Sequence, residues 1–131
     1  MEIILDTNIL IEILKGNQKT IKTVESLDSK ISISSISVME LFYGALNKAE
    51  LNKLEKFVSL FNIIYLDENI SKIAIKLIKT YAKSHSLDIP DSLIAATALT
   101  TNAKLFTYNK KDFKYIDKVE LIGWFSFLSK K

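Results

Sequence analysis

The stretch EIILDTNILIEILKG, residues 2–16, decides the fold of this chain. It opens with a short, apolar, β-branched run, residues 2–6, which is typical of a buried strand. Residues 7–15 follow at once and stop before Gly16, so they predict a helix. The polar side chain of Asp6 lies at the junction of the two.

The same alternation of strand and helix continues along the chain. The further predicted strands are residues 30–35, 62–66, 104–107 and 118–122. The further predicted helices are residues 18–28, 37–47, 50–61, 69–85 and 90–102, with one helical turn at 111–115. Short apolar strands separated by helices predict an α/β sandwich with a mainly parallel central sheet. Because three glycines, one proline and no linker-like stretch interrupt it, we expect residues 1–131 to form a single domain.

The composition limits the chemistry. Hydrophobic residues make up 48% and charged residues 25%, which is typical of a globular protein. The sequence has no cysteine and a single histidine, His85, so any metal ion must be held by oxygen ligands. All 18 basic residues are lysines, and the net charge of +3 permits nucleic-acid binding without requiring it. No signal peptide or membrane-spanning stretch is evident, so we expect a cytoplasmic protein.

Acidic and amide side chains follow two of the predicted strands. Asp6 stands at the carboxyl end of the first strand, and Asn109 and Asp112 follow strand 104–107. In parallel α/β sheets, ligands bind outside the carboxyl ends of the strands. Each acid also has a structural interpretation, because Asp6 suits a helix N-cap and Asp112 a polar loop with a cap.

Two further acids lie on predicted helices. Glu40 is surrounded in sequence by apolar and aromatic residues, and its i+4 neighbour is Gly44. This pattern fits either a carboxylate that faces an open site or a boundary glutamate on a mostly buried helix. Asp91 opens helix 90–102, where it suits the helix dipole and where Asp88 is placed to cap. The small apolar residues that follow favour close packing on the sheet, which carries Asp91 toward the strand ends.

The four acids have a joint chemical logic. Carboxylates that meet at one place repel or take up protons unless cations neutralise them. Carboxylate oxygens without His or Cys select Mg²⁺ or Mn²⁺. Such ions polarise phosphoryl oxygens and activate water, which is the chemistry of phosphodiester hydrolysis. We therefore predict Asp6, Glu40, Asp91 and Asp112 as both the catalytic and the metal-binding residues.

Four segments of the sequence resemble those of PIN-domain ribonucleases, especially the VapC toxins of bacterial and archaeal toxin–antitoxin pairs. They are IILDTNILIEIL with Asp6, SISVMELFYGA with Glu40, IPDSLIAATAL with Asp91 and LFTYNKKDF with Asp112, in the family's order. The resemblance implies a three-layer α/β/α fold and a metal-dependent endoribonuclease that acts on RNA. It also implies a homodimer, and a cognate antitoxin protein whose C-terminal segment blocks the active site.

The resemblance also implies supporting residues. Thr7 or Asn8, together with Asn109, would be the supporting polar groups. Asp88 is the second candidate for the third acid, and Ser92 stands where the family often has alanine.

Other interpretations compete with this one. The same fold could bind RNA or a protein without catalysis, although a silent site would tend to lose one of the acids. A haloacid-dehalogenase-type phosphatase needs a second Asp two residues after the first, where this chain has Asn8. A receiver domain needs an early acidic pair and a phosphoacceptor on an interior strand, which this pattern lacks. Outside the acids, we expect His85 to act as a helix C-terminal cap group, and Trp124, Phe125 and Phe127 to be core or dimer contacts.

Overall fold

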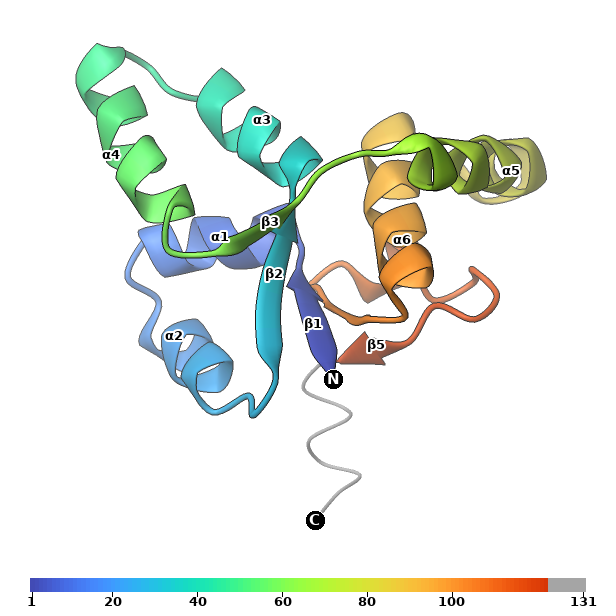
Figure 1. Ribbon diagram of the computed structural model, residues 1–131, viewed down its shortest axis with the longest axis horizontal. Helices are drawn as coiled ribbons and strands as arrows, with labels where there is room; N and C mark the ends of the chain where they lie inside the picture. The colour runs from blue at the N-terminus through green and yellow to red at the C-terminus, as the bar shows by residue number, and fades with distance from the viewer. Residues whose placement is uncertain (123–131) are drawn as a thin grey trace.

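A parallel sheet forms the centre of the computed structural model, which describes residues 1–122 (Figure 1). Its strands are β1 (Glu2–Leu5), β2 (Lys30–Ser34), β3 (Asn62–Ile64), β4 (Lys104–Phe106) and β5 (Leu121–Ile122). Their order in the sheet is β3-β2-β1-β4-β5, and each neighbouring pair is parallel. The predicted parallel sheet is therefore confirmed, with β1 at its centre.

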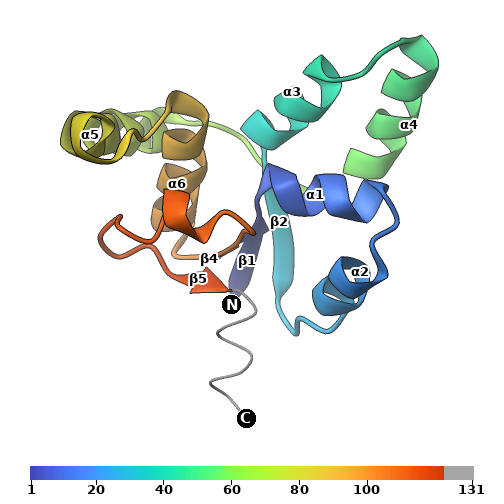
Figure 2. The same ribbon diagram turned by 180° about the vertical axis from the view of Figure 1, so that it is seen from behind.

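Helices cover both faces of this sheet. They are α1 (Thr7–Leu14), α2 (Gln18–Glu25), α3 (Ser35–Tyr43), α4 (Lys48–Val58), α5 (Glu68–His85) and α6 (Ile89–Thr101), and a 3-10 turn, η1, spans Lys110–Asp112. Helices α1 to α4 lie on one side and α5 and α6 on the other, as the two opposite views show (Figures 1 and 2). The three-layer α/β/α architecture is confirmed.

Alternation along β1 builds the two cores. Ile3 and Leu5 point to one face, where they pack with buried residues of α1, α3 and α4. Ile4 points to the other face, where it packs with α5 and α6. All three side chains are almost completely buried, so β1 serves both layers.

The ends of α3 differ from the prediction. Residues 37–47 were expected to be helical, but Ser34 accepts a hydrogen bond from the Ile36 backbone N–H and starts the helix two residues earlier. The helix then ends at Gly44, and Asn47 caps α4 through the Glu50 backbone N–H. Gly44 is therefore the C-cap of α3 and not a residue inside it.

The common strand direction gathers the ends of several elements at one edge. The carboxyl ends of β1 and β4 are tied there, because the Asp6 backbone N–H donates to the Phe106 carbonyl at 2.9 Å. Helices α1 and α3 begin directly after β1 and β2, and α3 also contacts α6. Residues Trp124, Phe125 and Phe127, predicted as core or dimer contacts, lie outside the described residues. None of the helices over residues 1–122 is both long and apolar enough to cross a membrane.

Candidate active site

Asp6 is the buried anchor of the carboxyl edge. Its side chain caps α1 by accepting from the Thr7 backbone N–H at 2.8 Å. The other carboxylate oxygen accepts from the Thr107 hydroxyl at 2.7 Å and from the Asn8 amide at 3.1 Å. Burial raises the pKa of Asp6, while the hydrogen bonds from Thr107, Thr7 and Asn8 oppose that rise. Asp6 is therefore both the N-cap and a member of the polar site, so its two sequence interpretations do not exclude each other.

Asn8 joins β1 to the loop after β4. Its amide nitrogen lies 3.2 Å from the Thr107 hydroxyl, and its side-chain oxygen accepts from the Tyr108 backbone N–H at 3.1 Å. Thr107 is completely buried and also accepts from the Asn109 backbone N–H at 3.0 Å. Asn109 thus contributes through its main chain, and its side chain is exposed.

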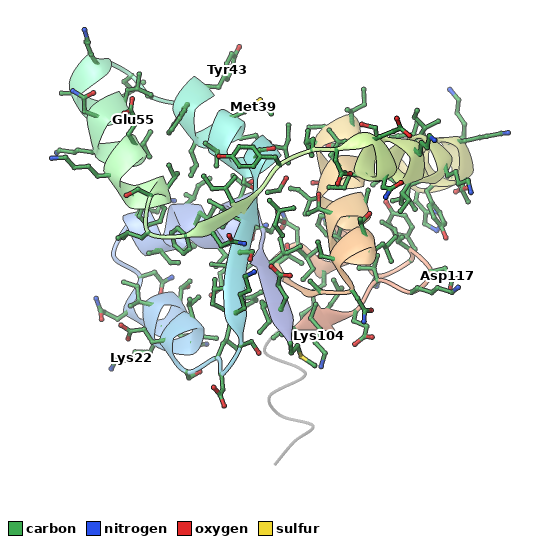
Figure 3. All side chains as sticks on the ribbon, in the orientation of Figure 1. Lys22, Met39, Tyr43, Glu55, Lys104 and Asp117 are labelled. Carbon is green, nitrogen blue, oxygen red and sulfur yellow. The ribbon has the colours of Figure 1, made fainter. Side chains whose placement is uncertain are left out.

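Glu40 is held at the edge by a hydroxyl contact. Thr7 donates from its hydroxyl to the Glu40 carboxylate at 2.8 Å, and the same hydroxyl lies 2.7 Å from that of buried Ser37. The contact joins the first residue of α1 to the middle of α3. Glu40 is exposed, in agreement with the interpretation of an acid beside an open site. It lines a hollow of about 370 Å³ with Met39 and Tyr43, which Figure 3 labels on α3.

Asp91 is freed from capping by its neighbour. Asp88 caps α6 by accepting from the Asp91 backbone N–H at 2.9 Å, so the Asp91 side chain stays available. Burial, and after it the negative charge of Asp88, raises the pKa of Asp91 from 3.8 to about 7. Asp6, Asp112 and Glu40 contribute to the same rise. The negative charges of all the other acids at this edge therefore contribute to the raised pKa of Asp91.

The four predicted acids lie within electrostatic range of one another at the carboxyl edge, because Asp6, Glu40 and Asp112 all act on Asp91. Asp6 and Glu40 also interact with each other, and Asp112 lies at the end of η1, directly before the fully buried Phe113. The ion pairs between described residues, Lys15–Glu12 and Lys72–Glu68, lie outside this cluster.

The donor types fit a hard divalent cation, because all of them are oxygens. As placed, however, no three Asp, Glu or His side chains of the described residues stand close enough to hold one ion. A shared ion would need these carboxylates to lie closer together than they do here.

Three residues of the site were not predicted from the sequence. Ser37 and Thr107 hold Thr7 and Asp6 in place, and Tyr115 lies near enough to Asp91, Asp112 and Asp88 for these acids to raise its pKa, after burial as the main cause. Ser37 precedes Glu40 by one helical turn and Thr107 directly follows β4, so the sequence positions of both indicated the site. The position of Tyr115 did not, because it follows a short turn.

Comparison with known proteins agrees with this geometry. Residues 3–119 match the family model of the PIN domain. Ribonuclease VapC of Rickettsia bellii is 32% identical over 130 residues, covering 93% of this chain and 96% of the relative. The structure of VapBC-1 from nontypeable Haemophilus influenzae superposes with a TM-score of 0.81 at 30% identity, covering 95% of this chain and 99% of that one. A toxin–antitoxin complex from Klebsiella pneumoniae gives a TM-score of 0.77 at 30% identity, covering 92% and 95%.

The family match spans most of the sequence, and the alignments cover nearly the full length of this chain and of each relative. The segments that carry Asp6, Glu40, Asp91 and Asp112 all fall within the matched residues. This chain therefore belongs to the PIN-domain family, in its group of VapC ribonucleases.

Proposed function

We propose that this chain is the toxin of a toxin–antitoxin pair and that it hydrolyses RNA with Mg²⁺ or Mn²⁺ held by Asp6, Glu40, Asp91 and Asp112. The observation that carries the proposal is that these carboxylates lie at one sheet edge, within electrostatic range of Asp91. Such an arrangement is costly for folding, since buried and mutually repelling charges destabilise the native state. It is expected where a cation is to be bound.

The residues of the chain would share the work as follows. Asp6 is immobilised by its hydrogen bonds and so offers a fixed oxygen. Thr7 orients Glu40 toward the same edge, and Asn8 braces the loop that carries Thr107. We assign the first ion to Asp6, Glu40 and Asp91, and to Asp112 either a second ion or the orientation of the attacking water. A bound divalent ion would supply charge stabilisation at the phosphoryl oxygens and lower the pKa of water.

The partners follow from the same assignment. The relative from Klebsiella pneumoniae is a toxin–antitoxin complex, and we extend this to a cognate antitoxin that covers the carboxyl edge of this chain. We further propose a homodimer, one domain over residues 1–131 and action in the cytoplasm. A module that binds RNA without cleaving it is less consistent with four acids retained together.

Cleavage of RNA by matched variants tests the proposal. The wild-type chain, Asp91→Asn and Glu40→Gln would be incubated with host RNA in Mg²⁺, in Mn²⁺ and in EDTA. Loss of one carboxylate is expected to lower the rate about 100-fold or more, as is typical when charge stabilisation in the transition state is lost. Asp28→Asn, an exposed acid distant in sequence from the cluster, is the matched control and should cleave like the wild type. Equal cleavage by Asp91→Asn and the wild type, or full activity in EDTA, would contradict the proposal.

A further inference from the structure

Three aromatic side chains form a stack beside the acid cluster. Tyr81 and His85 come from the last turns of α5. Tyr115 comes from the loop after η1, and the same loop carries Asp117, which is labelled in Figure 3. The rings of His85 and Tyr115 lie parallel, with centroids 4.2 Å apart and planes 9° apart. Tyr81 meets both rings edge-on, at 5.8 Å from His85 and 5.1 Å from Tyr115. His85 was predicted as a cap group at the end of this helix; it is the last residue of α5, whose C-cap is Ser86, and its ring lies in this stack.

The loop that carries Tyr115 is anchored in the hydrophobic core. Phe113 and Ile116, on either side of Tyr115 in the sequence, are buried against the core of α5 and α6. The Asp117 backbone N–H donates to the Tyr81 hydroxyl at 3.2 Å, which ties the loop to α5 a second time. Tyr115 therefore has little freedom to turn away from His85.

The stack also reaches the acids. Burial, and after it the charges of Asp91, Asp112 and Asp88, raises the pKa of Tyr115, so its hydroxyl lies within the electrostatic range of the cluster. In the part of the chain that the structure describes, no partner accepts a hydrogen bond from this hydroxyl. His85 is the other ring of the parallel pair, and its side chain is exposed.

We propose that the His85 and Tyr115 rings form a platform on which a base of single-stranded RNA stacks, beside the phosphate held at the acid cluster. The proposal rests on the proposed function. Tyr115 covers one face of the His85 ring, and a flat base would cover the other. Aromatic and histidine rings are the usual platforms for unpaired RNA bases, and they accept bases with little sequence preference. The Tyr115 hydroxyl lies within electrostatic range of the cluster, so a base on the platform and a phosphate at the acids would belong to one strand.

Binding of two RNA strands tests the platform separately from cleavage. The probes are fluorescein-labelled oligoadenylate of ten nucleotides and a labelled ribose–phosphate decamer without bases, measured by fluorescence polarisation. All proteins carry Asp91→Asn to keep the RNA intact. The ratio of the two Kd values reports what the bases add. Leucine at His85 removes the ring, and phenylalanine at the same position keeps a flat ring.

The parent is expected to bind oligoadenylate at least about tenfold more tightly than the strand without bases. His85→Leu should lower that ratio about fivefold or more, whereas His85→Phe should retain it. Tyr65→Leu, which removes a tyrosine that is 70% exposed, is the matched control and should leave the ratio unchanged. An unchanged ratio in His85→Leu, or a parent that does not distinguish the two strands, overturns the platform. Because the ratio is read from binding alone, this failure is distinct from a wild-type chain that does not cleave RNA.

Discussion

Replacing Asp91 by asparagine should stabilise the metal-free protein at alkaline pH while removing its activity. The folded-state pKa of Asp91 is raised from 3.8 to about 7, first by burial and then by the surrounding acids. A raised pKa means that the folded chain holds the Asp91 proton more tightly than the unfolded chain does. The corresponding stability is fully present below pH 3.8 and is lost as the pH rises through about 7. Asparagine has no proton to lose, so the variant escapes this loss.

The size of the effect can be worked from the same values. A pKa difference between 3.8 and about 7 corresponds to about 4 kcal/mol as an upper bound. Asp91 is partly exposed, so solvent screening should reduce this to about 1–2 kcal/mol. The variant also loses the favourable interaction of an acid with the first turn of α6, which costs about 0.5 kcal/mol. A net gain of about 1 kcal/mol remains, equivalent to a rise in Tm of about 3–5 °C for a domain of this size.

Thermal unfolding in EDTA at pH 4, 6 and 8 measures this gain. The difference in Tm between Asp91→Asn and the wild type should be near zero at pH 4 and largest at pH 8. Asp28→Asn makes the same chemical change at an exposed position and should show no such trend. A variant that is less stable than the wild type at pH 8, or a gain independent of pH, would refute the electrostatic reasoning.

Three further predictions concern other parts of the molecule. Thr7→Val removes the hydroxyl that holds Glu40 and should lower kcat about tenfold or more with a loss of stability of only about 1 kcal/mol, whereas Thr7→Ser should restore activity in the same cleavage assay. Addition of Mg²⁺ or Mn²⁺ at about 100 times its Kd should stabilise the wild type by about 2.7 kcal/mol and Asp91→Asn much less, and thermal shifts without any stabilisation would argue against a metal site. Ser86 has φ 58° in the left-handed region at the end of α5, so Ser86→Gly should raise the free energy of unfolding, measured by urea denaturation, by up to about 1 kcal/mol, and a lower free energy of unfolding would show that this strain is absent.

The architecture could be predicted from the sequence because the signals for strands and helices are local. Apolar runs, helix caps and turns each act within a few residues, and parallel strands then bring their carboxyl ends to one edge without further instruction. This is why Asp6 and Asp112, separated by more than a hundred positions, could be expected at one place. The same logic failed at the ends of α3, where the competing caps Ser34 and Asn47 decided the boundary.

Contacts that depend on side-chain rotamers were beyond the sequence. The bond from Thr7 to Glu40 joins residues 33 positions apart, and no periodicity predicts which hydroxyl will reach which carboxylate. The aromatic stack is a similar case, since His85 and Tyr115 belong to an exposed helix end and a loop. Their pairing follows from how the loop is anchored by Phe113 and Ile116, which only the packed structure reveals.

Asp6 is both the N-cap of α1 and a member of the acid cluster, and this affects the choice of an inactive variant for experiments in cells. Its carboxylate caps α1 and also accepts hydrogen bonds from Thr107 and Asn8, so Asp6→Ala would leave buried donors without acceptors at a cost of about 1–3 kcal/mol each. A harmless phenotype in cells that express such a variant could then reflect degradation of a misfolded chain. Glu40→Gln changes an exposed side chain, and the glutamine side-chain oxygen can still accept the hydrogen bond from the Thr7 hydroxyl. The amount of protein in the cell should therefore be preserved. Genetic tests of toxicity are therefore better read from position 40 than from position 6.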